Sequence, residues 1–324
     1  MVKAIALFSG GLDSILAAEV VRRLNIEVLG LAFETPFFSA GKAQDAARLI
    51  KLPLIVENIA AEHLLMLKSP RYGYGKNMNP CIDCHTLMLR TAGNKMSETC
   101  AEFILTGEVL GQRPMSQGKQ SLFVVAKNSG YADYILRPLS AQLLEPIKAE
   151  REGKIDRSKL LAIQGRGRKQ QIQIAAAFGI TDYAAPAGGC LLTDPMFARR
   201  LRDLFSHQED RQIRDIELLK YGRHFRINDG FKIIVGRNHS DNESLKTFSV
   251  SDDYILSMAD FPGPQVVVPY GCDDYVLNTA ASLCVRYSDA PDNIEANVTC
   301  HKGDTFFILR AGAAAKEDCE RWII

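Results

Sequence analysis

The feature that most restricts the fold is a six-residue loop, SGGLDS at residues 9–14, which joins a short apolar run to a helical pattern. Residues 2–8 are apolar enough for a buried strand, and residues 15–24 place apolar side chains on one helical face. Glycines at such a turn let the backbone approach a ligand closely, and the helix N-terminus favours an anion. The pattern predicts a phosphate-binding turn at the carboxyl edge of a parallel sheet. The alternative is a plain strand-to-helix turn capped by Asp or Ser.

Short apolar runs and helical patterns keep alternating through the first half of the chain, which predicts an α/β fold, a parallel sheet with helices on both faces. Further strands are predicted at residues 27–33, 54–56 and 102–106, with helices at 42–50, 81–96, most of 141–180, and a charged helix at about 197–219.

From residue 222 the pattern changes. Short β-branched runs at residues 232–235 and 265–268 are broken by glycine and proline, which predicts a smaller C-terminal α+β domain. We therefore divide the chain into a nucleotide-binding domain, a connector with a cysteine-bearing loop and the charged helix, and a C-terminal domain. Their predicted bounds are residues 1–180, 181–221 and 222–324.

The net charge of +1 conceals an asymmetry. Residues 237–324 hold seven basic and fourteen acidic residues, whereas residues 148–169 and 199–226 are basic. Basic stretches can neutralise phosphates, although many are only solvated helix faces. No apolar run approaches the roughly 20 residues of a membrane span, and the apolar start is too short for a signal peptide. We expect a cytoplasmic protein, without membrane contact, whose eight cysteines stay reduced unless they bind metal or do chemistry.

Three cysteines stand out. Cys81 and Cys84 form a C-x-x-C at a predicted helix start, where the helix dipole is expected to lower thiol pKa values. Cys190 follows the glycine loop that begins at Ala184, which would let it approach the other two. Three thiolates can hold an iron–sulfur cluster of the 4Fe-4S type with one open iron. A structural zinc site that adds His85 is the alternative.

The hexapeptide resembles the SGGxDS loop of the ATP pyrophosphatase (PP-loop) family, which has the adenine nucleotide alpha hydrolase-like fold and cleaves ATP between the α and β phosphates. The segment TGEVLGQ at residues 106–112, with SQ at 116–117 and LRPL at 136–139, resembles the TGxSLGQxxSQ…RPL pattern of 4-thiouridine synthetases. Leu89 and Arg90, after Cys84, are similar to the region that follows the active-site cysteine in those enzymes. The resemblance covers about residues 1–180. No THUMP-like RNA-binding segment precedes the loop, and no rhodanese-like segment follows.

The resemblance implies an RNA thiolase. ATP and Mg²⁺ bind at the loop, a uridine carbonyl is adenylated, and sulfur arrives through cysteines as a persulfide or from a cluster. Cys84, Cys190 and Asp13 are the predicted catalytic residues, and Arg113 and Lys119 are candidates to stabilise developing charge. The predicted ATP contacts are Ser9, Gly10, Gly11, Asp13, Ser14, Phe33, Thr106 and Gly107. The predicted cluster ligands are Cys81, Cys84 and Cys190.

The C-terminal part resembles the NFACT RNA-binding domain, through IVGRN at residues 234–238, PGP at 262–264 and VVV at 266–268. The implied partner is tRNA or another structured RNA, contacted by Arg166, Arg168, Lys169 and Arg237. The implied sulfur donor is a cysteine desulfurase or free sulfide, and a homodimer is left open. Two rival functions remain: an amidating ATP pyrophosphatase, which gives the three cysteines no role, and an RNA-binding module with a redundant ATP domain.

Overall fold

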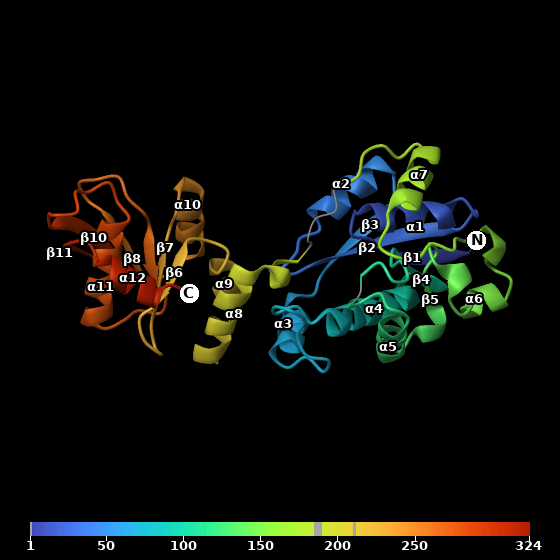
Figure 1. Ribbon diagram of the computed structural model, residues 1–324, viewed down its shortest axis with the longest axis horizontal. Helices are drawn as coiled ribbons and strands as arrows, with labels where there is room; N and C mark the ends of the chain where they lie inside the picture. Colours follow the sequence, from blue (N-terminus) through green and yellow to red (C-terminus); the bar gives the residue numbers. More distant parts are fainter. Residues whose placement is uncertain (1, 114, 185–189, 210–211) are drawn as a thin grey trace. The chain divides into compact units, whose positions relative to one another are not determined.

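The computed structural model describes every residue except 1, 114, 185–189 and 210–211, and it divides into two compact units, Met1–Thr193 and Asp194–Ile324 (Figure 1). Each unit has its own sheet and its own core. The predicted connector, residues 181–221, is shared between the units, because its first part packs with the N-terminal one and the rest with the C-terminal one. Five residues of the predicted cysteine loop, 185–189, lie outside the described part.

The N-terminal unit holds a five-stranded sheet of order β3-β2-β1-β4-β5, in which every pair is parallel. Its strands are β1 (Lys3–Leu7), β2 (Glu27–Glu34), β3 (Leu54–Asn58), β4 (Phe103–Thr106) and β5 (Ile135–Leu136). Its helices are α1 (Leu12–Arg22), α2 (Gly41–Leu49), α3 (Ala60–Lys68), α4 (Cys81–Glu98), α5 (Lys119–Ser129), α6 (Lys148–Arg151) and α7 (Lys169–Ala177).

Helices cover both faces of this sheet (Figure 1). Along β1, Ala4 and Ala6 point into the core shared with α1 and α2, whereas Ile5 points into the core shared with α4 and α5. This alternation follows from the two-residue period of a strand, and burial on both faces explains why β1 reads as a continuous apolar run. The predicted α/β class with helices on both faces is confirmed.

The prediction that residues 141–180 are mainly helical is wrong. Only α6, with four residues, and α7, with nine, are α-helical there. Gly153 and Gly165 have positive φ values of 71° and 87°, a conformation that ends a right-handed helix. The apolar residues of this stretch, such as Ile147, Ile155 and Ile163, pack from loops and short turns onto the α1 side of the sheet.

The C-terminal unit holds an antiparallel sheet of order β11-β10-β8-β9-β7-β6. Its strands are β6 (Arg223–Arg226), β7 (Lys232–Val235), β8 (Tyr254–Met258), β9 (Val266–Val268), β10 (Ala296–Lys302) and β11 (Thr305–Ala311). Its helices are α8 (Pro195–His207), α9 (Ile213–Leu218), α10 (His239–Phe248), α11 (Asp274–Arg286) and α12 (Lys316–Trp322). The predicted α+β character is confirmed, but the predicted charged helix is two helices, α8 and α9.

The two faces of this sheet are covered differently. Ile233 and Val235 of β7 pack in the core that contains α11, whereas Ile234 packs in a smaller cluster with Leu218 of α9 and Leu245 of α10. Pairing across the sheet therefore brings α9 and the end of α8 close to β6 and β7. Lys232 begins β7 at this place, and the loop after β9 reaches the same region.

Candidate active site

The loop at residues 9–14 lies where β1 ends and α1 begins, as predicted. Gly10 has φ +74°, and a Cβ atom there would lie 2.2 Å from the backbone oxygen of Lys42. Only glycine therefore fits between the loop and the start of α2. Gly11 caps α1 and has no side chain, so the cap residue itself does not occupy the first amides of that helix. Free amides at a helix N-terminus form a site for an anion.

The end of β4 closes against this loop. A Cβ atom on Gly107 would lie 2.6 Å from the backbone nitrogen of Ser14, so the two backbones touch. Thr106, the last residue of β4, is buried, and Phe33 near the end of β2 is buried in the core with α4. The predicted ATP residues thus come from the carboxyl ends of three neighbouring strands, β2, β1 and β4.

The two carboxylate oxygens of Asp13 differ in their hydrogen bonding to the described residues. Its Oδ2 accepts a hydrogen bond from Gln112 Nε2 at 2.7 Å, and Arg168 Nη2 lies 3.5 Å from the same atom. Its Oδ1 is buried without a hydrogen-bond partner among the described residues. A buried carboxylate oxygen is normally paired, and an unpaired one suits a metal ligand. Asp13 therefore fits the predicted Mg²⁺ through Oδ1.

Arg168 lies at this loop, although we predicted it to contact RNA. It is the residue before α7, and Gln171 in the first turn of α7 donates to Gln112 Oε1 at 2.9 Å. The start of α7 is thereby tied to Asp13 through Gln112. Arg166 and Lys169, the other predicted RNA contacts nearby, are exposed. We predict RNA contact for all three basic residues from the sequence, whereas in the structure Arg168 lies at the nucleotide loop and the other two are exposed.

A buried ion-pair network follows Gly107. Glu108 Oε2 accepts from Arg137 Nε at 2.9 Å and from the Thr106 hydroxyl at 3.1 Å, and Oε1 lies 3.1 Å from His85 Nδ1. Burial alone would raise the pKa of Glu108, but the Arg137 guanidinium and His85 hold the pKa down at about 2. The thiolase-like motif contains Glu108 and Arg137, yet their pairing with His85 was not predicted. His85 stands beside Cys84, so this network joins the end of β4 to the cysteine helix.

The three predicted cysteines lie in one region of the N-terminal unit. The Cys84 thiol is close enough to both Cys190 and Cys81 for their charges to raise its pKa, and Cys190 is affected by Cys81 in the same way. Asn79 Nδ2 donates to Cys81 Sγ at 3.3 Å. All three thiols are partly buried.

Backbone contacts fix the Cys190 segment on both sides. Ala184 forms a parallel bridge with Gly11 of the nucleotide loop. Beyond Cys190, the Leu191 amide donates to the Phe37 carbonyl at 3.2 Å, and the Leu192 carbonyl accepts from the Met78 amide at 3.1 Å. The described ends of this segment therefore lie at the nucleotide loop and beside the C-x-x-C helix.

The expectation that the helix start lowers thiol pKa values is wrong for Cys84. Burial raises the pKa of Cys84, and Cys190, Cys81 and Asp83 raise it further. Burial also raises the pKa of Cys190 to about 11, against the Leu192 amide. Desolvation thus outweighs the helix dipole at this site.

The three thiols match an iron–sulfur ligand set in type and number. However, no group of three or more described His, Cys, Asp or Glu side chains has the spacing to hold a metal ion. We therefore derive no step through a cluster or a zinc ion. His85, the fourth ligand of the zinc alternative, has its Nδ1 directed at Glu108 instead.

Arg237, the predicted RNA contact of the C-terminal unit, pairs with Asp241, with 2.6 Å between Arg237 Nε and Asp241 Oδ2. The Arg237 side chain is 42% exposed, so part of the guanidinium remains accessible. Arg113 and Lys119 are both exposed. In the described part of the chain, no helix is long and apolar enough to cross a membrane.

Comparisons with known proteins agree with these two units. Residues 1–149 match the family model of the thiamine biosynthesis protein (ThiI), and residues 222–323 match that of the NFACT protein RNA binding domain. The tRNA-specific 2-thiouridylase MnmA of Xanthobacter autotrophicus (strain ATCC BAA-1158 / Py2) is 23% identical over 166 residues, which are 45% of this chain and 42% of that protein. The chain thus spans less than half the length of this curated relative.

Two solved structures are also similar. A 4-thiouridine synthetase in complex with RNA and bound ATP is 20% identical, with a TM-score of 0.37, over 56% of this chain and 54% of that one. The C-terminal part of the fibronectin/fibrinogen-binding protein from Streptococcus suis is 14% identical, with a TM-score of 0.28, over 56% of this chain and 86% of that one. The chain is therefore similar to the ThiI family over residues 1–149 and to the NFACT RNA-binding domain over residues 222–323.

Proposed function

We propose that this protein is an ATP-dependent RNA uridine thiolase, acting on tRNA or another structured RNA. One observation carries the proposal: two consecutive residues after β4 contact the nucleotide loop and the cysteine helix, respectively. Gly107 lies against Ser14 of the loop, and Glu108 holds His85 beside Cys84. An adenylated substrate at the loop would thus be near a thiol, as a sulfur transfer requires.

The chemistry has two steps. The uridine carbonyl oxygen attacks the α phosphate of ATP at the loop, and pyrophosphate leaves. Mg²⁺, held through Asp13 Oδ1, would supply charge neutralisation when bound. The terminal sulfur of a Cys84 persulfide then attacks the adenylated carbon, and AMP leaves with the original oxygen. The Cys190 thiolate breaks the S–S bond, so that uridine keeps the sulfur and a Cys84–Cys190 disulfide forms, which a thiol reductant resets.

The alternative is an iron–sulfur cluster on Cys81, Cys84 and Cys190 as the sulfur source, although the described side chains do not have the spacing to hold a metal ion. The persulfide form needs a donor of sulfane sulfur, such as a cysteine desulfurase, whereas free sulfide could supply only the cluster alternative. An amidating enzyme would leave the three thiols without a role. A protein that only binds RNA would give no role to Asp13 Oδ1, which has no hydrogen-bond partner among the described residues.

The test uses the full chain, purified without oxygen, with RNA from cells that lack the gene. We expect AMP, pyrophosphate and thiolated uridine as products, and Asp13→Ala should abolish all three. Cys84→Ser and Cys190→Ser should abolish thiolation, whereas the exposed Cys100 provides the control variant Cys100→Ser. ADP as the main product, or thiolation by Cys84→Ser, would contradict the proposal.

The iron content separates its two forms. About four irons per chain, lost on Cys81→Ser, would indicate the cluster. A colourless active protein that needs Cys84 and Cys190 would indicate the persulfide.

A further inference from the structure

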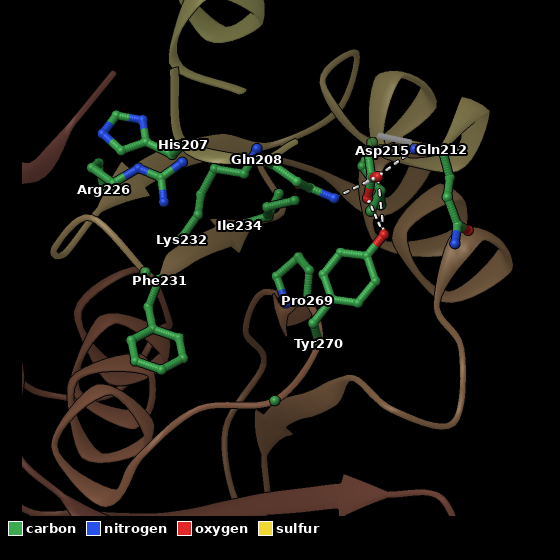
Figure 2. Close-up of a pocket in the computed structure, with 13 residues that line it drawn as sticks. His207, Gln208, Gln212, Asp215, Arg226, Phe231, Lys232, Ile234, Pro269 and Tyr270 are labelled. Carbon is green, nitrogen blue, oxygen red and sulfur yellow. Dashed lines mark hydrogen bonds between the residues drawn. The ribbon is translucent and has the colours of Figure 1, made fainter. Parts of the chain in front are cut away.

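The C-terminal unit contains a cleft of about 370 Å³ between the end of α8, α9, the β6–β7 pair and the loop after β9. Figure 2 shows Lys232, Arg226 and Gln208 on one side, with Pro269 and the Tyr270 ring opposite. The α8 and α9 residues of its lining precede residue 222, and so lie outside the matched RNA-binding domain.

Lys232 brings to this cleft an ammonium group that forms no direct ion pair with a described residue, although the Asp203 and Asp215 carboxylates lie nearby. Among the described residues it makes no hydrogen bond and no ion pair, whereas Arg226 is held by Asp203 through bonds of 3.0 and 2.6 Å. Burial lowers the pKa of Lys232 to about 8, although the Asp203 and Asp215 carboxylates oppose the shift. A desolvated charge without a partner is costly, so the site suits a ligand that brings negative charge.

Tyr270 forms a fixed wall of the cleft. Its hydroxyl donates to the Asp215 carboxylate, with 2.8 and 2.9 Å to the two oxygens, and Gln208 Nε2 donates to the same carboxylate at 2.9 Å. The residue is 47% exposed and has φ +64°, which is unfavourable for an aromatic side chain. A strained backbone that presents a partly exposed, fixed ring is typical of a ligand contact.

We propose that this cleft binds one unpaired nucleotide of RNA, with its phosphate at Lys232 and its base against Tyr270. Aromatic rings and lysines are the side chains by which proteins hold single-stranded RNA. The volume is close to that of the smallest ligand pockets, about 300 Å³, so it admits one nucleotide but no duplex. This inference rests on the proposed function in one respect: the proposed function names the RNA that the cleft would bind. A free mononucleotide has the same chemistry, and the experiment distinguishes the two.

The experiment measures fluorescence anisotropy of the full chain, without ATP, with a short labelled oligouridylate and with an RNA duplex of equal length. Lys232→Met should weaken oligouridylate binding about tenfold, and should reduce the slope of log affinity against log salt by about 0.7, one phosphate on a single strand. Tyr270→Asn should weaken binding about tenfold without changing the slope, since asparagine tolerates the left-handed conformation. Duplex binding should change in neither variant.

The exposed Lys316 provides the charge-matched control, Lys316→Met, which should leave oligouridylate binding unchanged. Equal oligouridylate affinity in wild type, Lys232→Met and Tyr270→Asn would overturn the proposal, as would an equal loss of duplex binding. UMP that competes as strongly as the oligonucleotide would assign the cleft to a free nucleotide and overturn the RNA assignment. AMP formation is measured separately, so a failure of the thiolase proposal leaves this test intact.

Discussion

Arg168 Nη2 lies 3.5 Å from Asp13 Oδ2, although 155 positions separate the two residues. The contact joins the residue before α7 to the loop after β1. It directs one oxygen of Asp13 toward Arg168 and Gln112, while the other has no hydrogen-bond partner in the described part of the chain. This arrangement leads to the first prediction.

Arg168→Met should reduce ATP turnover about tenfold or more at limiting Mg²⁺, because partners that orient a metal-binding carboxylate usually affect metal affinity by 10- to 100-fold, roughly. The matched change Arg166→Met removes an exposed arginine two positions away, a predicted RNA contact, and should leave the Mg²⁺ dependence of turnover unchanged. Steady-state AMP formation over a Mg²⁺ series measures both. The same Mg²⁺ dependence in the two variants would mean that the Arg168 contact has no role in nucleotide chemistry.

Gly107→Ala should raise the KM for ATP and leave RNA binding intact. The added methyl would meet the Ser14 backbone nitrogen at 2.6 Å, and a backbone atom at a helix start cannot move aside without displacing the loop. Small displacements of a positioned group can cost about 100-fold in rate. Gly130→Ala is a useful comparison for folding, since nothing lies within 4 Å of its Cβ position, although its φ of +85° makes alanine strained. An unchanged KM for ATP in Gly107→Ala would show that the loop and β4 are not rigidly packed.

Glu108→Gln should destabilise the N-terminal unit by about 3–5 kcal/mol at neutral pH, because it leaves the Arg137 charge buried without a counter-charge. The pKa of Glu108 is about 2, below its ordinary value of 4.5, so its stabilising effect is complete above pH 4.5 and is lost toward pH 2. The difference between wild type and variant should therefore shrink as the pH falls through this range. Amide hydrogen exchange of β4 peptides measures this difference in stability. The change Glu98→Gln, at an exposed glutamate, is the control. A difference that stays constant down to pH 2 would contradict this account.

His63 should make the same unit less stable in mild acid. Its ring is buried between Phe37 and Phe38, with centroid distances of 5.3 and 5.7 Å, and neither ring nitrogen has a hydrogen-bond partner among the described residues. Burial lowers its pKa from 6.5 to about 4. Since the unfolded chain binds the proton more readily, stability should fall by up to about 3 kcal/mol as the pH drops from 6.5 to 4. In His63→Leu, exchange of α3 peptides should lose this pH dependence; retention of it would point to another group.

Lys232→Met should stabilise the C-terminal unit, and more so at pH 7 than at pH 10.5. The folded-state pKa of about 8 lies below the ordinary 10.5, so the cost of charging Lys232 grows as the pH falls from 10.5 to 8 and is constant below that. The single tryptophan, Trp322, packs against the core of this unit and reports its unfolding. A variant less stable than wild type at pH 7 would show that Lys232 has a structural role.

Local sequence patterns determined several secondary-structure elements and the position of the nucleotide loop. The apolar run, the glycine pair and the helical period of residues 2–24 predict β1, the nucleotide loop and α1, because each depends on residues adjacent in sequence. The β-branched run at 232–235 predicts β7 with the observed bounds. The cysteine helix begins at Cys81, as predicted. The helix prediction for residues 141–180 is wrong because the apolar residues there lie in loops that pack on the core. Their spacing along the sequence alone does not distinguish such loops from a helix.

The tertiary structure decided what each polar group faces. Arg168 contacts Asp13 rather than open solvent, and Glu108 joins Arg137 to His85, since the parallel sheet brings the ends of distant strands together. The pKa of the Cys84 thiol is raised because burial removes water, which a helix-start motif cannot reveal. Residue type and spacing specify the available chemistry, but charge and reactivity depend on burial and on partners that only the folded chain supplies.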